Sequence, residues 1–238
     1  TTSGIRSPGG IGANHLGDMF YCDNQGPWNG SSSLKHLKIG SFQGNPTGNA
    51  HYQLTDAIGP RPEDPKSGSR IVEEAERIPE YVPPACILPH GSMGNSPAGI
   101  ACDQTDGKFG PFKNQLFIAE QTASQVQRVS LEQVNGVYQG ACFPFLSGFK
   151  SGNVAIRFGE DGILFNGGTS RGWGSRGGSN FALERVNWTG KVPFEMLHVS
   201  AKPDGFEITF TQPADFATLK DLASYNAKAY TYIYPILY

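Results

Sequence analysis

Ser7-Pro8-Gly9-Gly10-Ile11 recurs later in the chain as Ser96-Pro97-Ala98-Gly99-Ile100. A short apolar stretch follows each copy, Met19 to Cys22 after the first and Leu116 to Ala119 after the second. Apolar stretches bounded by Gly and Pro are typical of β-strands. Because the whole pattern is repeated, we predict small units of one strand order that pack against their neighbours.

A third unit begins less clearly, at Gly152 to Ile156, and continues through the turn Asp161-Gly162 into the apolar stretch Ile163 to Phe165. Its end resembles the end of the second unit, because Ser124 to Val129 and Ser179 to Val186 both finish on Arg-Val. The implied period is about 55 residues, slightly longer than is usual for a repeat unit.

We therefore predict an all-β chain whose residues 1–189 form part of a β-propeller of the six-bladed type. Three blades of four short strands are expected at about 1–50, 92–150 and 151–189. A Pro-rich insertion with a short helix is expected at about 45–91. Since three blades do not close a propeller, we expect further blades upstream and a chain that begins inside a longer protein.

From about Thr189 the sequence pattern changes. Phe206 to Thr211 alternates apolar and polar residues, as a half-buried antiparallel strand does, and Tyr230 to Tyr234 alternates in the same way. Together with a short helical segment at Ala217 to Tyr225, these features resemble the start of an immunoglobulin-like β-sandwich. We predict a truncated sandwich at 190–238, because a whole one needs about 100 residues.

The formal net charge of the 238 residues is −2, and no run of Lys or Arg provides the basic surface that nucleic-acid binding requires. No apolar stretch approaches the roughly 20 residues of a membrane-spanning helix. We therefore expect neither a nucleic-acid partner nor a membrane span.

Four cysteines, Cys22, Cys86, Cys102 and Cys142, lack the close pairing of zinc sites, and their disulfide state stays open. Cys22 and Cys102 each end an apolar stretch and precede Asp, which predicts equivalent strand ends.

Residues 4–27, GIRSPGGIGANHLGDMFYCDNQGP, resemble a blade of the soluble quinoprotein glucose and sorbosone dehydrogenases. Most of residues 85–238, with segments such as GGTSRGWGSRGG, resembles the dehydrogenase-like propeller of large multidomain secreted proteins of planctomycete-type bacteria. The resemblance implies a secreted or periplasmic protein that transfers hydride from a small sugar or alcohol to pyrroloquinoline quinone (PQQ), with calcium. A c-type haem domain of the same full-length protein is the implied partner.

The same resemblance implies roles for a few residues. Arg6 matches the arginine that faces the quinone oxygens, and Ser7 stands where the family has a cofactor-contacting Asn. Gly26 and Pro27 match the residues whose backbone carbonyls hold calcium, an ion that prefers oxygen ligands. Each has a structural alternative: Arg6 could cap strand carbonyls, and Gly26-Pro27 is also typical of a turn. The histidine base of the family belongs to a blade that this chain lacks, so no catalytic residue is assigned and the fragment alone is expected to be inactive.

The loop from Arg171 to Arg176 combines glycines, which allow close backbone approach, with Trp173 and arginines, which offer a stacking face and charge. We expect Arg171 and Trp173 to contact the cofactor, or else the loop is a blade connection with a packing Trp. Two functions remain: a PQQ-dependent dehydrogenase propeller, or a noncatalytic propeller that binds a glycan or a protein. A histidine at the top of an upstream blade would favour the enzyme.

Overall fold

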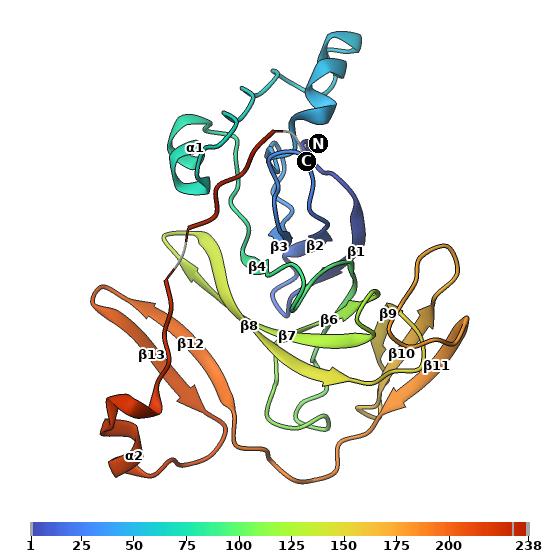
Figure 1. Cartoon of the computed structure of the whole chain (residues 1–238), viewed down its shortest axis with the longest axis vertical. Helices are drawn as coiled ribbons and strands as arrows, with labels where there is room; N and C mark the ends of the chain where they lie inside the picture. Colours follow the sequence, from blue (N-terminus) through green and yellow to red (C-terminus); the bar gives the residue numbers. More distant parts are fainter. Residues whose placement is uncertain (1, 230, 237–238) are drawn as a thin grey trace.

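Three antiparallel sheets and one two-stranded hairpin account for the strands of the described residues, 2–229 and 231–236, in the computed structural model (Figure 1). In each sheet, strands that are consecutive in sequence are neighbours in space. This architecture confirms the predicted all-β class. Thr1, Tyr230, Leu237 and Tyr238, which belong to the predicted units 1–50 and 190–238, lie outside the described residues.

The first sheet contains β1 (Pro8–Ala13), β2 (Met19–Asp23), β3 (Ser32–His36) and β4 (Cys86–Leu88). The second contains β5 (Pro97–Cys102), β6 (Leu116–Glu120), β7 (Gln125–Val134) and β8 (Val137–Ser147). The third contains β9 (Asn153–Phe158), β10 (Leu164–Thr169) and β11 (Phe181–Val186). The hairpin is β12 (Met196–Lys202) with β13 (Gly205–Phe210). The helical segments are η1 (Pro46–Leu54), α1 (Ile71–Arg77), α2 (Phe216–Lys220) and η2 (Leu222–Ser224).

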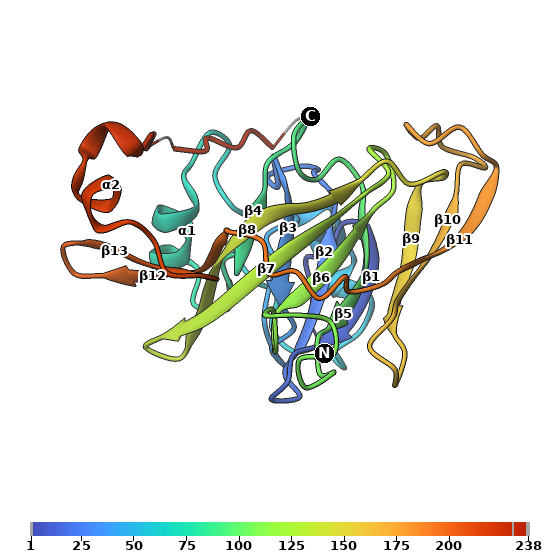
Figure 2. The ribbon, with the colours of Figure 1, turned by 90° about the horizontal axis from the view of Figure 1, so that it is seen from below.

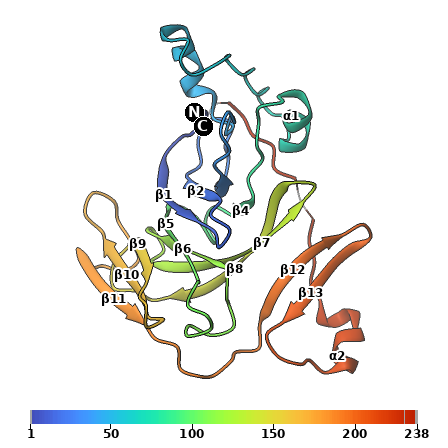
Figure 3. The ribbon, with the colours of Figure 1, turned by 180° about the vertical axis from the view of Figure 1, so that it is seen from behind.

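The first strands of the sheets pack directly on one another, β1 on β5 and β5 on β9, where the three sheets meet (Figure 3). The glycines of the repeated motif make this contact possible. A Cβ atom on Gly9 would lie 2.1 Å from the carbonyl oxygen of Pro97, and one on Gly10 would lie 2.3 Å from that of Ala98. The Gly-Gly of the first motif is therefore required by the backbone of the next sheet.

The second and third sheets share one strand register. Phe117 of β6 pairs with Arg128 of β7, and Phe165 of β10 pairs with Arg185 of β11. The recurring Arg-Val thus marks equivalent positions in two third strands, as the repeat predicts.

The predicted equivalence of Cys22 and Cys102 is wrong. Cys22 lies in β2, a second strand, whereas Cys102 ends β5, a first strand. Both cysteines happen to be followed by an Asp, which is the last residue of β2 but lies just after β5. A short motif of this kind does not distinguish the strands of one sheet.

The segment between β3 and β4 leaves the first sheet, forms η1 and α1, and returns (Figure 1). Within the range 45–91, expected as insertion, Cys86–Leu88 is a ladder strand that pairs with β3. Trp28, Phe42, Ile78 and Tyr81 form a separate apolar cluster under this excursion. The insertion therefore has a small core of its own, fixed to the first sheet.

The C-terminal residues complete that cluster. Tyr234 is 4% exposed and lies against Trp28, with the two rings 6.0 Å apart. The carbonyl of Pro235 accepts the backbone N–H of Trp28 at 3.0 Å, and Tyr234 forms an isolated bridge with Ser69. Within the described part of 190–238, the strands are those of the β12–β13 hairpin. The Tyr-rich segment, expected as part of the sandwich, instead lies against the first unit, where Tyr234 forms its bridge.

Arg128 fixes the hairpin to the second sheet. Its guanidinium donates to the carbonyls of Met196 at 2.9 Å and Leu197 at 3.3 Å, and it stacks between the rings of Phe112 and Phe143. Figure 2 shows the hairpin beside the long strands β7 and β8. No helix among the described residues has the length and apolar character needed to cross a membrane.

Candidate functional site

A cavity of about 660 Å³ opens at one end of the three first strands. Its walls come from the residues before and at the start of β1, β5 and β9 and from the residues that follow β2, β6 and β10. Ser7 and Ser96 both line it, so the two Ser-Pro motifs lie on the same rim, as the repeat predicts.

Four residues expected from the sequence to contact a cofactor line this one cavity: Arg6, Ser7, Arg171 and Trp173. They come from the first and third units and are far apart in the chain. Gly26 lies behind the cavity wall, where a Cβ atom would approach Cγ of Arg6 to 2.6 Å. Neither Gly26 nor Pro27 belongs to the described lining.

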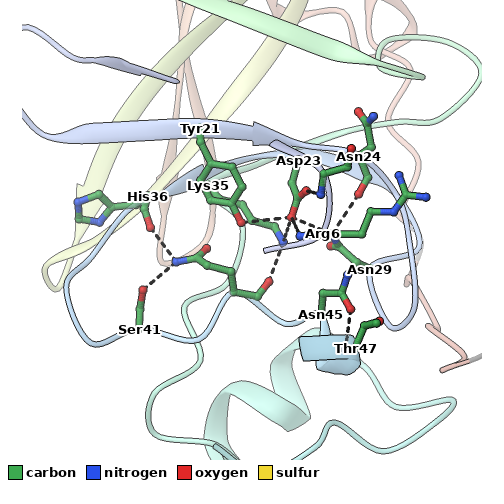
Figure 4. A network of polar contacts seen from close by, with 12 residues as sticks. Arg6, Tyr21, Asp23, Asn24, Asn29, Lys35, His36, Ser41, Asn45 and Thr47 are labelled. Carbon is green, nitrogen blue, oxygen red and sulfur yellow. Dashed lines mark hydrogen bonds and ion pairs between the residues drawn. The ribbon is translucent and has the colours of Figure 1, made fainter. Parts of the chain in front are cut away.

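Asp23 is fully buried at the end of β2 and anchors the segment before β1 (Figure 4). Its carboxylate accepts the backbone N–H of Arg6 at 3.2 Å and that of Ser7 at 2.7 Å. The ammonium of Lys35, also fully buried, lies 3.3 Å from Oδ2, and the hydroxyl of Tyr21 donates at 3.2 Å. The backbone of Arg6 is thereby fixed, while its guanidinium extends away from Asp23 (Figure 4).

Burial acts on both neighbours of Asp23. It lowers the pKa of Lys35 from its usual value, and the charge of Asp23 opposes this shift. Burial also raises the pKa of Tyr21, and the Asp23 carboxylate raises it further. Tyr21 therefore stays protonated and keeps donating its hydrogen bond.

Glu120 repeats this arrangement in the second sheet. At the end of β6, its carboxylate accepts the backbone N–H of Asn95 at 3.1 Å and that of Ser96 at 2.7 Å. In both sheets, an acidic side chain at the end of the second strand thus binds the backbone of the entry segment, the two residues just before the first strand. This is the local reason why both entry segments reach the same cavity.

The cavity has a positive lining. Arg6 and Arg171 contribute guanidinium groups, and no Asp or Glu occurs among the described lining residues. Neither arginine forms an ion pair with another described residue. Asn24 is a further lining residue, and its amide oxygen Oδ1 is buried without a hydrogen-bond partner in the described structure. Such a lining suits an anionic ligand with polar edges.

The 170–177 loop reaches the cavity through backbone contacts with the second sheet. Gln121 donates its side-chain amide to the carbonyl of Trp173 at 3.1 Å, and Arg176 donates its backbone N–H to Thr122 at 2.8 Å. The Trp173 side chain is nevertheless 80% exposed. The loop does connect β10 to β11, as the second interpretation had it, but Trp173 is not packed against other described residues.

His90, Asn95 and Gln121 are among the lining residues that the sequence reasoning missed. His90 is exposed and lies just after β4, and the histidines showed no telling spacing in the sequence. Asn95 and Gln121 could have been found from the repeat. They occupy the positions in the second unit that Arg6 and Asn24 occupy in the first.

The residues expected to hold calcium form a tight turn. Gly26 and Asn29 exchange two backbone hydrogen bonds of 2.8 Å, so one lone pair of the Gly26 carbonyl is already used. Among the described residues, no cluster of three or more His, Cys, Asp or Glu side chains could hold a metal ion. A cation here would meet neutral oxygen atoms of the protein.

A second cavity, of about 780 Å³, lies at the other end of the first strands and is lined by the ends of β1, β5 and β9. Asp106 and Glu160 line it together with Lys108 and Arg157. Its mixed charge distinguishes it from the arginine-lined cavity, and none of the predicted cofactor residues lies there.

The arrangement of the sheets can be compared with solved proteins. A glucose dehydrogenase structure aligns with 78% of this chain and 46% of its own, at 21% identity and a TM-score of 0.51. The chain shares part of the fold of a solved glucose dehydrogenase.

Two further structures show lower scores: the PQQ-bound aldose sugar dehydrogenase of Streptomyces coelicolor and the PQQ domain of a pyranose dehydrogenase from Coprinopsis cinerea. The first has a TM-score of 0.46 at 17% identity and covers 77% of this chain and 44% of its own. The second has 0.42 at 14% identity and covers 77% and 55%. The chain thus spans about half the length of these proteins. No family model and no curated protein matches the chain.

Proposed function

We propose that this chain is part of a dehydrogenase propeller that binds PQQ in the arginine-lined cavity and oxidises a small sugar or alcohol. The convergence of Arg6, Ser7, Arg171 and Trp173 on one cavity carries the proposal. The fold shared with a glucose dehydrogenase supports it.

The residues present fit such a ligand. PQQ is a flat polyanion, and guanidinium groups bind carboxylates through charge-assisted hydrogen bonds. Arg6 and Arg171 supply these donors without competing acidic side chains in the described lining, and the exposed Trp173 offers a stacking face. When bound, PQQ would supply the hydride acceptor, and the arginines would bind and orient it. The base that removes the substrate proton is not assigned to a residue of this chain.

We include calcium in the proposal as an ion that binds together with PQQ. The second lone pair of Gly26, the carbonyl of Pro27 and the orphan oxygen of Asn24 are neutral ligands, whereas calcium sites usually include carboxylates. The carboxylates of the quinone would supply the missing charge. We therefore expect PQQ binding to require calcium, and calcium alone to bind weakly.

The wider proposal covers the full-length protein. It comprises a six-bladed propeller, an immunoglobulin-like sandwich from residue 190, secretion or a periplasmic location, and a c-type haem domain. The fragment alone is proposed to be inactive. Cell fractionation and a haem absorbance spectrum of the full-length protein would test location and haem content.

Calorimetric titration of PQQ into the calcium-loaded full-length protein tests the site. A hydrogen bond to a charged group contributes about 1.5–3 kcal/mol, so Arg6→Ala and Arg171→Ala should each weaken binding about tenfold to hundredfold. Lys108→Ala, which removes a cation from the opposite cavity, is the matched control and should bind normally. The proposal fails if wild type gives no heat, or if the control loses as much affinity as the arginine variants.

A noncatalytic glycan-binding propeller is the second candidate. One observation favours it: Trp173 is 80% exposed at the rim of a polar cavity, as are many sugar-stacking aromatics. Tryptophan fluorescence during titration with sugars would distinguish the two. Sugar binding lost in Trp173→Ala, without PQQ binding and without dye reduction, would favour the binding module.

A further inference from the structure

All four cysteines contribute to one apolar cluster between the first and second sheets. Cys22 and Cys86 are buried in it, and Cys102 and Cys142 pack against it. They nevertheless lie on different strands, so their possible pairings differ sharply in distance.

Pairings within a sheet can be judged from the strand register. In the first sheet, Cys22 pairs with Leu34, which pairs with Cys86. Two strand spacings separate these cysteines by about 9.5 Å, beyond the limit of about 7 Å between Cα atoms for a disulfide.

In the second sheet, Cys102 pairs with Leu116, Leu116 with Val129, and Val129 with Cys142. Three strand spacings place Cys102 about 14 Å from Cys142. Neither within-sheet pairing can close without moving the backbone.

Cys86 and Cys142 meet across the interface between the sheets. Cys86 lies on β4 and Cys142 on β8, the outer strands, which are in contact. The two sulfur atoms share one acceptor, because Sγ of Cys142 lies 3.4 Å and Sγ of Cys86 3.6 Å from the carbonyl oxygen of Ile87. Both thiols therefore lie beside the same carbonyl oxygen.

We propose that Cys86 and Cys142 form a disulfide that joins the outer strands of the first and second sheets under oxidising conditions. The two thiols play unequal parts. The interaction between the two thiols raises the pKa of Cys86 and lowers that of Cys142. Cys142 is also the more exposed of the two, so it is the attacking group.

The oxidant is a small-molecule disulfide such as oxidised glutathione. The Cys142 thiolate attacks one of its sulfur atoms, its S–S bond breaks, and one glutathione thiolate leaves and takes up a proton. The Cys86 thiolate then attacks the mixed disulfide at the Cys142 sulfur and expels the second glutathione, which is also protonated. Two protein thiols lose two electrons, and one glutathione disulfide becomes two thiols.

The test is refolding of the full chain from urea in a glutathione redox buffer, followed by a non-reducing tryptic peptide map. Trypsin leaves Cys86 and Cys102 together on peptide 78–108 and Cys142 on peptide 129–150. The map is therefore also made on Cys102→Ser, where a link between these two peptides identifies Cys86. Cys22→Ser is a second control that should keep the link.

Thermal unfolding provides an independent measure. Closing the loop between residues 86 and 142 should raise the melting temperature of the oxidised chain by roughly 10 °C over the reduced chain. Cys142→Ser should show the same melting temperature in both buffers. Four titratable thiols in the refolded oxidised chain, or a linked pair other than Cys86 and Cys142, would overturn the proposal.

Discussion

The buried pair of Asp23 and Lys35 should stabilise the protein only as a pair. Both side chains are fully buried, and the ammonium of Lys35 has a second partner in the carbonyl of Gln43 at 2.7 Å. Lys35→Met leaves a buried carboxylate without its counter-charge, which typically costs about 3–5 kcal/mol. Asp23→Asn leaves the ammonium unpaired and should cost a similar amount. Either loss is a large part of the about 5–15 kcal/mol that stabilises an ordinary domain.

The double variant separates charge pairing from packing. With both charges removed, the amide oxygen of Asn at position 23 can still accept the N–H of Ser7, so the double loss should be well below the sum of the single losses. Urea unfolding of all four proteins measures the coupling, expected at about 2 kcal/mol or more. Single losses below about 1 kcal/mol that simply add would refute the pairing argument.

Three other outcomes are expected. Burial lowers the pKa of His36, so the folded state favours the neutral ring. The stability that the neutral ring contributes is present above pH 6.5 and is lost as the pH falls through the lower pKa of the folded state. His36→Phe should therefore flatten the fall in thermal stability from pH 7 to 5, and an unchanged pH profile would exclude this role. Gly10→Ala should lower the free energy of unfolding in urea by about 1–3 kcal/mol or more, because the added Cβ would lie 2.3 Å from the carbonyl oxygen of Ala98. Gly174→Ala is the control, because the space around Gly174 is open, and it should be nearly neutral in the same assay. Tyr234→Ala should lower the free energy of unfolding by about 3–5 kcal/mol in urea, because it removes a buried ring. Tyr234→Phe should be nearly neutral, because the hydroxyl has no hydrogen-bond partner in the described structure, and equal losses in the two variants would contradict this role of the ring.

Most strands of the repeated pattern could be predicted because their signal is local, although the third sheet has three described strands where four were expected. The Ser-Pro motifs, the apolar second strands and the turn at Asp161-Gly162 each carry the residues that their backbone requires. The strand Cys86–Leu88 was not predicted. It has three residues between prolines, and its partner β3 precedes the whole excursion, so only tertiary packing identifies it as a ladder strand.

The candidate site was predicted in part. Arg6 and Ser7 followed from the family resemblance, and Arg171 and Trp173 followed from the composition of their loop, but their common cavity depends on how the sheets stack. His90 could not be found, since it lies after that unrecognised strand. The Gly26 carbonyl was expected to hold a cation, but it accepts the backbone N–H of Asn29. The sequence indicates a turn here without showing which backbone groups of the turn pair.

The contact between Trp28 and the C-terminal segment has a consequence for the order of folding. The early strands β1 to β3 leave the ribosome long before Pro235, whose carbonyl accepts the Trp28 amide. Contacts between residues so distant in sequence form slowly, and N-terminal segments ordinarily begin to fold first. The aromatic cluster of the first unit would therefore stay open during synthesis as a surface for chaperones. In pulse-labelled hydrogen exchange, the Trp28 amide should gain protection after the amides of β6, and earlier protection would contradict this order.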